Sequence, residues 1–294
     1  MPGVNSGPTP PAGVDLERPS VARIYDYYLG GKTNWAVDRE FADGVLKTFP
    51  LLRDIALANR MFLNRVVRHL ARHGVRQFLD IGAGVPTEGN THEVCDELSR
   101  AECRRPDTRV VYVDNEPVAV AHAEILLDQE GDPHRHAVIT ADLREPDDVW
   151  EQALDTELLD PHAPVAVLLI AVLHVHQPGR HGADVGAESV ARFRELLPSG
   201  SLIAISHATQ DGVPPDLAES FTELKRSYDL ASSSDLIFRS RAEISALLDG
   251  WPMLDPGWSW TPEWHPEETG PTVRTITFPS PSHAGLWAGV GRKP

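Results

Sequence analysis

The stretch from Phe78 to Gly84, which reads FLDIGAG, constrains the fold more than any other part of the sequence. Its apolar residues predict a buried strand over 77–81, and its two glycines predict a tight turn directly after that strand. A second apolar run, Val111 to Val113, ends on Asp114. Ligands of open α/β sheets bind outside the carboxyl ends of the strands, so this order predicts a ligand site beside the glycine turn.

Strand-like and helix-like patterns alternate along the chain from this first strand onward. Their order predicts a mostly parallel sheet covered by helices. The Trp-rich segment 253–260 and residues 286–292 predict an antiparallel hairpin at the sheet edge, and Thr272 to Phe278 alternates as a strand does. The other expected elements are strands at 109–113, 137–140, 164–173 and 201–206, and helices at 92–101, 117–128, 214–230 and 240–248.

The segment before the first strand is predicted to be helical. Ser20 is a candidate N-cap for a helix over 21–29 that Gly30 ends, a second helical pattern follows Asn34, and a longer one spans 51–73. Residues 1–18 are rich in proline and predict a disordered leader. We therefore expect three parts: a leader at 1–18, a helical segment at 19–74 and an α/β domain at 75–294.

Composition excludes several classes of protein. The net charge of −16 over 294 residues, without a dense run of Lys and Arg, argues against a nucleic-acid substrate. Cys95 and Cys103 show no metal or redox spacing, and the longest apolar run, Val165 to Leu173, is too short to cross a bilayer. We expect a cytoplasmic protein with no membrane partner.

The residues at successive strand ends suit an adenosyl ligand. The turn reads Gly-x-Gly-x-x-Thr, and Thr87 stands where a dinucleotide-binding turn has its third glycine. Asp80 adds negative charge that opposes a pyrophosphate but favours a methionine ammonium or sulfonium. Asp114 can accept both ribose hydroxyls, and Asp142, which precedes Leu143 after the third strand, can accept the adenine amino group.

This ordered set resembles the class I S-adenosylmethionine-dependent methyltransferases over roughly residues 75 to 292. More specifically, the chain resembles an S-adenosyl methyltransferase family that is known mainly from actinobacteria and was once described as a domain of unknown function. The segments that carry this resemblance are Arg23 to Asn34 (RIYDYYLGGKTN), Asn59 to Leu63, Gln77 to Thr87, Val110 to Asp114 and Leu168 to His174.

The resemblance implies a Rossmann-like methyltransferase fold, with a seven-stranded and mostly parallel sheet, an antiparallel edge hairpin and an N-terminal helical lid at 19–74. It implies S-adenosylmethionine as the cofactor. In this reading Asp80, Gly82 and Gly84 hold the methionine part, Asp114 the ribose, and Asp142 with Leu143 the adenine. Ala83, Asn115 and Ala171 lie at the same strand ends and complete the candidate cofactor residues of the sheet.

Two further groups of cofactor residues are expected outside the strand ends. The resemblance places Tyr28, Gly30, Lys32 and Asn34 in the lid, together with Tyr25 and Gly31, although the tyrosines can equally be packing anchors of a helix. His92 opens the helix after the glycine turn, where free N–H groups suit the cofactor's carboxylate, and a structural role is the alternative.

The candidate catalytic residue is His174, at the end of the fourth strand. Methyl transfer needs a base only where the acceptor must lose a proton, and His174 can be that base or have a structural role. His176 and His181 follow it, but no acid or cysteine completes a ligand set, so we expect no metal. Trp251, Trp258, Trp260 and Trp264 are candidate walls of an apolar acceptor pocket.

The sequence thus predicts a methyltransferase that acts on a small molecule. A protein that binds S-adenosylmethionine or its demethylated product without turnover is one alternative. A nicotinamide-dependent oxidoreductase is another, disfavoured by Thr87 and Asp80. The methyl acceptor and the oligomeric state do not follow from the sequence.

Overall fold

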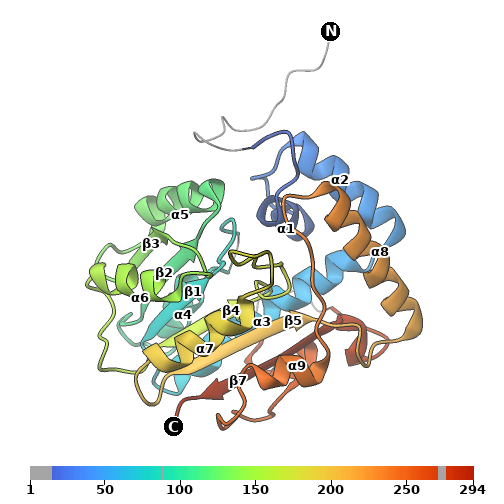
Figure 1. Cartoon of the computed structure of the whole chain (residues 1–294). Coiled ribbons are helices and arrows are strands. Elements are labelled where there is room, and N and C mark those ends of the chain that lie inside the picture. The colour runs from blue at the N-terminus through green and yellow to red at the C-terminus, as the bar shows by residue number, and fades with distance from the viewer. Residues whose placement is uncertain (1–14, 88, 271–275) are drawn as a thin grey trace.

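A computed structural model describes residues 15–87, 89–270 and 276–294 of the chain. Within them, seven strands form one sheet in the order β3-β2-β1-β4-β5-β7-β6, with helices on both faces (Figure 1). The strands are β1 Gln77–Ile81, β2 Arg109–Asp114, β3 His136–Thr140, β4 Ala166–Ile170, β5 Leu202–Ala208, β6 Ser259–Trp260 and β7 Leu286–Arg292.

The helices of the described residues connect and cover these strands. The α-helices are α1 Val21–Leu29, α2 Ala36–Thr48, α3 Leu52–Arg72, α4 Thr91–Ala101, α5 Pro117–Glu130, α6 Pro146–Asp155, α7 Gly186–Leu196, α8 Pro215–Ala231 and α9 Arg241–Ala246. Short 3₁₀ turns occur at η1 Thr261–Glu263, η2 Pro266–Glu268 and η3 Pro281–Ala284. Among the helices that the structure describes, none combines the length and apolar character that a membrane span requires.

The first five strands run parallel, and the last two close the edge in the antiparallel sense. β7 pairs with β5 from Leu202 opposite Arg292 to Ala208 opposite Leu286, and β6 pairs with β7. This confirms the expected edge hairpin. β1 lies between β2 and β4, so the strand order reverses there and opens a crevice at the carboxyl ends of these strands.

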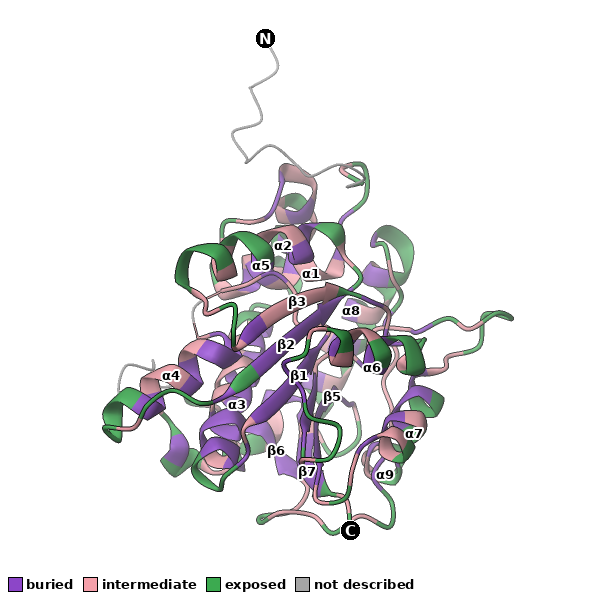
Figure 2. Cartoon of the chain, turned by 90° about the vertical axis from the view of Figure 1, so that its left-hand side faces the viewer, coloured by how far each residue is buried: buried purple, intermediate pink, exposed green. Residues whose placement is uncertain are grey.

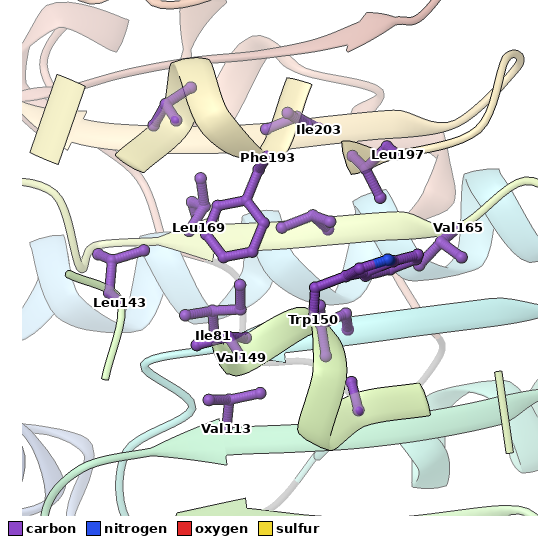
Figure 3. Packing of buried hydrophobic residues seen from close by; sticks show 14 of the residues in the cluster. Ile81, Val113, Leu143, Val149, Trp150, Val165, Leu169, Phe193, Leu197 and Ile203 are labelled. Atoms are coloured by element: carbon purple, nitrogen blue, oxygen red, sulfur yellow. The ribbon is translucent and has the colours of Figure 1, made fainter. Parts of the chain in front are cut away.

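Alternate residues of each strand serve two separate cores, because side chains on a strand point to opposite faces. On one face, Leu79 and Leu169 pack with Trp150 of α6 and Phe193 of α7. Figure 3 shows Leu169, Trp150 and Phe193 in this core. On the other face, Phe78 and its neighbours pack against α3 and α4. Figure 2 shows the central strands buried along their length, so the sheet gives the site a rigid base.

The N-terminal helices form a third core together with α8. Ile24 of α1 and Val45 of α2 lie in the same apolar cluster as Phe221 and Tyr228 of α8. Figure 1 shows α2 alongside α8, although about 170 residues separate them in the sequence. Segments from both ends of the chain therefore build this side of the molecule.

Several expected elements differ from those observed. The sequence patterns did not predict α6 or α7, whose few apolar residues are separated by acidic and basic ones. His136, which reads as part of a polar loop, is buried as the first residue of β3. Residues 1–14 of the expected leader and 272–275 of the alternating segment lie outside the described residues, and 276–278 form no strand.

Candidate functional site

The glycine turn follows β1 and needs glycine for two reasons. Gly82 and Gly84 both have a φ of +68°, a conformation that side chains disfavour. A Cβ on Gly82 would also lie 2.5 Å from Cγ2 of Val172. The N–H groups of Gly82 and Ala83 donate to the Val113 carbonyl at 2.9 and 3.2 Å, so the turn is held against the end of β2.

Asp80 and Arg60 place opposite charges at one end of this turn. Asp80, buried on β1, accepts a 2.6 Å hydrogen bond from Oγ1 of Thr91 at the start of α4. Burial raises the pKa of Asp80, while the Thr91 hydroxyl and the Arg60 guanidinium lower it. Arg60 of α3 donates to Oδ1 of Asn90 at 3.0 Å. Both charges line the same cavity.

Asp114 ends β2 with its carboxylate fixed by the backbone. The N–H of Gly84 donates to Oδ2 at 2.7 Å, and the N–H of Glu116 donates to Oδ1 at 2.8 Å. Burial raises the pKa of Asp114 to about 6, although these two N–H groups act in the opposite direction. Each oxygen keeps a lone pair for another donor. The bond from the Gly84 N–H to Asp114 therefore directly joins two residues that are 30 positions apart in the sequence.

After β3, Asp142 is held by neighbouring side chains while Leu143 faces the cavity. Partial burial raises the pKa of Asp142, but bonds from Arg144 and Asn115 outweigh it and hold the value at about 2. Arg144 Nη2 lies 2.6 Å from Oδ2 of Asp142, and Asn115 Nδ2 lies 3.0 Å from it. Leu143, Ala141, Asn115 and Arg144 line the cavity, whereas Asp142 is not among its lining residues.

These strand ends surround one cavity of about 420 Å³, called the cofactor cavity below. The structure brings together there ten of the residues predicted from the sequence. They are Tyr25, Asp80, Gly82, Ala83, Gly84, Asp114, Asn115, Leu143, Ala171 and His174. Side chains at consecutive sheet edges therefore share one space, as the strand order requires.

Apart from Tyr25, the residues predicted around the N-terminal glycines lie elsewhere. Asp26 accepts bonds from the Thr33 N–H and from Nδ2 of Asn34, at 2.9 and 2.7 Å. A Cβ on Gly31 would lie 1.8 Å from Oδ1 of this carboxylate, so only glycine fits. Gly30 and Lys32 are exposed at this turn, and none of these residues borders the cofactor cavity.

His92 and Tyr28 are buried away from the cofactor cavity. The Tyr112 hydroxyl lies 2.7 Å from Nδ1 of His92 and accepts a 2.9 Å bond from its backbone N–H. The His92 ring packs against His136 with centroids 4.7 Å apart, and burial lowers the pKa of His92. Tyr28 borders a second, apolar cavity. The geometry of His92 matches the structural alternative.

A chain of hydrogen bonds joins the end of β4 to the N-terminal helices. The Ala171 N–H donates to Oγ of Ser206 at 3.0 Å, and this hydroxyl donates to Oδ1 of Asn59 at 2.6 Å. Nδ2 of Asn59 donates to the Tyr25 hydroxyl, which donates to the Ala56 carbonyl, both at 3.1 Å. Ala171 has a φ of +59°, a conformation that is uncommon for residues other than glycine. The chain of hydrogen bonds holds this conformation in place.

His174 follows this bend and is fixed through one ring nitrogen. The Ala208 N–H lies 3.3 Å from Nδ1 of His174. Burial, and then the nearby Arg239 guanidinium, lower the pKa of His174 to about 4. The ring is therefore neutral near pH 7. His176 also borders the cofactor cavity, and His181 is exposed in the following loop.

Sequence reasoning missed several lining residues and proposed others that the structure places elsewhere. Arg60, Asn59 and Glu116 border the cofactor cavity without having been assigned a role. A charged or amide residue within the apolar stripe of α3 is the signal that would have found the first two. Among the described residues no tryptophan borders either this cavity or the apolar one, and Trp264 is wholly buried against Phe62.

The lining of the cofactor cavity fits S-adenosylmethionine. Arg60 and Asp80 offer opposite charges for a zwitterionic amino-acid end, and Asp114 offers lone pairs for a diol. Ala141 and Leu143 offer apolar surface for a base. The sheet order and this site define a Rossmann-like α/β protein of the adenosyl-binding type.

Comparisons with known proteins give the family. A family profile described as S-adenosyl methyltransferase matches residues 8–294. The chain therefore belongs to the S-adenosyl methyltransferase family, its methyltransferase fold is the one expected, and S-adenosylmethionine is its cofactor. A search of curated proteins gives no match.

Two solved structures are similar over nearly the whole chain. One is a provisionally assigned methyltransferase from Thermobifida fusca, with 33% identity and a TM-score of 0.81, covering 97% of this chain and 98% of its own. The other is a DUF574 family protein from Streptomyces avermitilis, with 33% identity and a TM-score of 0.79, covering 95% and 99%. The expected resemblance to a family once described as a domain of unknown function is confirmed.

Proposed function

We propose that this protein transfers the methyl group of S-adenosylmethionine to a small molecule. The observation that carries the proposal is the single cavity that Asp80, Gly84, Asp114 and Leu143 share at three neighbouring strand ends. When bound, S-adenosylmethionine supplies an electrophilic methyl group on a sulfonium. The protein's own contribution is to bind, orient and exclude water.

Each part of the cavity has a proposed role. Arg60 binds the methionine carboxylate and Asp80 the ammonium, since these two side chains carry the matching charges. Asp114 accepts the ribose hydroxyls through the lone pairs that its backbone bonds leave free. Leu143 packs on the adenine, and Asp142 acts indirectly by holding Arg144 and Asn115 in place.

We propose that residues 19–74 cover this cavity as a lid. Tyr25 of α1 and Asn59 and Arg60 of α3 line part of its wall. The lid is held to the sheet by the bond between Asn59 and Ser206. In this proposal the turn around Gly31 and Asn34 shapes the lid instead of contacting the cofactor.

Calorimetry with S-adenosylhomocysteine, followed by a search for acceptor-dependent S-adenosylhomocysteine formation, tests the proposal. We expect binding at one site per chain, and turnover with at least one member of a library of small alcohols, phenols and amines. Absence of binding would remove the proposed site. Binding without turnover on any library member would favour the non-catalytic sensor, and binding of NADH instead would favour the oxidoreductase.

A further inference from the structure

A second cavity adjoins the cofactor cavity and differs from it in character. It measures about 70 Å³ and shares five lining residues with the cofactor cavity, among them Ala171 and His174 at the end of β4. The remainder of its wall comes mainly from apolar and aromatic side chains such as Tyr28, Phe221 and Tyr228. We call this space the aromatic cavity. His174 lies in the wall of both cavities.

No Lys, Arg, Asp or Glu lines the aromatic cavity within the described part of the chain. Its titratable groups are His174 and the tyrosines, and burial raises the pKa of Tyr25, Tyr28 and Tyr228. All of these side chains are therefore uncharged near pH 7. A charged group entering this space would lose its hydration without gaining a counter-charge, so the cavity selects uncharged groups.

The size of the aromatic cavity limits what enters it. A cavity of about 150 Å³ lined by apolar side chains holds benzene. The aromatic cavity has about 70 Å³, roughly half of that volume, which suits a short alkyl group instead of a whole ring. The remainder of an acceptor must then lie in the neighbouring cofactor cavity.

His174 is the polar group shared by the two cavities that keeps a donor for a ligand, because the hydroxyl proton of Tyr25 already goes to the Ala56 carbonyl and Asn59 donates to Tyr25. Because the Ala208 N–H points at Nδ1, the neutral ring carries its proton on Nε2. The adjacent His207 is fixed in the other tautomer, since Arg239 lies 2.7 Å from its Nε2 and the Ala208 carbonyl accepts from its Nδ1. No described residue bonds to Nε2 of His174. His174 thus offers a donor to a ligand, and its bonded Nδ1 is not free to take a proton from one.

We propose that the aromatic cavity binds a short, uncharged alkyl part of the methyl acceptor, whose oxygen or nitrogen accepts a hydrogen bond from Nε2 of His174. This inference rests on the proposed function and narrows its acceptor to neutral molecules with a small apolar end. His174 becomes a group that orients the acceptor by donating a hydrogen bond, in place of the general base expected from the sequence.

Binding of butan-1-ol, butyrate and butylammonium to the protein saturated with S-adenosylhomocysteine tests this inference. The three probes share one alkyl chain and differ in charge, and nuclear magnetic resonance of histidine ring signals reports binding at His174. We expect saturable shifts with butan-1-ol, with a Kd at least about tenfold lower than for either ion. Nitrogen shifts of the ring should place the proton on Nε2. Equal binding of an ion, or a proton on Nδ1, would overturn the inference.

Leu224→Phe fills the aromatic cavity and should weaken butan-1-ol binding by about tenfold or more. Leu230→Phe is the matched control, because Leu230 lies on the same helix and is 78% exposed, whereas Leu224 is 6% exposed. Ala56→Leu fills the same space from α3 and serves if Leu224→Phe does not fold. Equal effects of the filling and control variants would also overturn the inference.

The affinity for S-adenosylhomocysteine distinguishes a failure of the proposed function from a failure of the inference about the aromatic cavity. Wild type and all three variants should bind it alike, because none of the substituted residues lines the cofactor cavity. If the wild type fails to bind it, the proposed function fails. If it binds and butan-1-ol does not, only the inference about the aromatic cavity fails.

Discussion

The two sides of the site differ in how their polar groups are held. On the sheet side, Asp80 and Asp114 accept hydrogen bonds from Thr91 and from backbone N–H groups, so charge is placed rigidly. On the helix side, α1, α3 and α8 present tyrosines, phenylalanines and leucines around a small cavity. His174 stands where the two sides meet.

This difference separates the recognition of two ligands. Rigidly held carboxylates suit a cofactor, because its amino-acid end and its ribose are the same in every turnover. An apolar cavity with one neutral donor suits a smaller partner, which is selected by its shape and lack of charge. Changes at the strand-end carboxylates and at Arg60 should therefore alter cofactor affinity, whereas changes at residues that line only the aromatic cavity should spare it.

Asp114→Ala should have the largest effect on cofactor affinity. Removing a carboxylate that accepts two ribose bonds should weaken S-adenosylhomocysteine binding by about one to three powers of ten. Calorimetry measures this change. Asp128→Ala, at an exposed position of α5, is the control and should bind like wild type. An unchanged affinity for Asp114→Ala would contradict the division between the two sides.

Arg60→Gln should follow, because it removes one charge-assisted bond to the methionine carboxylate. We expect affinity for S-adenosylhomocysteine to fall by about ten- to a hundredfold, while affinity for adenosine stays the same. Arg226→Gln, on the exposed face of α8, provides a matched control. Equal losses for both ligands would place Arg60 at some other part of the cofactor.

Asn59→Leu tests the connection between the two sides. It leaves the buried Ser206 hydroxyl without its acceptor and removes a donor to Tyr25, so the free energy of unfolding should fall by about 1–3 kcal/mol. Urea unfolding measures this. In the double variant Asn59→Leu with Ser206→Ala, the loss of free energy of unfolding should be less than the sum of the losses in the two single variants. Full additivity would show that the hydrogen-bond chain does not act as a unit.

The pH dependence of cofactor binding should be the smallest effect. The ionised form of Asp114 accepts the ribose bonds, and its pKa in the free protein is about 6. Affinity should therefore fall as pH falls through this value, and be about tenfold weaker at pH 5 than at pH 7.5. Asp114→Asn should bind weakly at both pH values. A dependence that persists in this variant would assign the titration to another group.

The strand ends could be predicted because the cause is local. An apolar run, a glycine pair and an acid describe β1, its turn and the end of β2 without reference to the remainder of the chain. Because they follow successive strands, these residues were expected at one edge of the sheet, and they line one cavity there. The helices α6 and α7 escaped prediction because each buries only a narrow stripe, and packing against the sheet decides their formation.

The side that faces the acceptor was decided by tertiary structure. Phe221 and Tyr228 reach Tyr28 only because α8 packs across the N-terminal helices. The sequence does not show which core a buried tyrosine joins. The tautomer of His174 depends on an N–H from β5, far away in the sequence. The sequence by itself determined the sheet, its glycine turn and its acids, since these rest on neighbouring residues. Only the folded chain decided which aromatic side chains surround His174, because contacts between distant segments form that cavity.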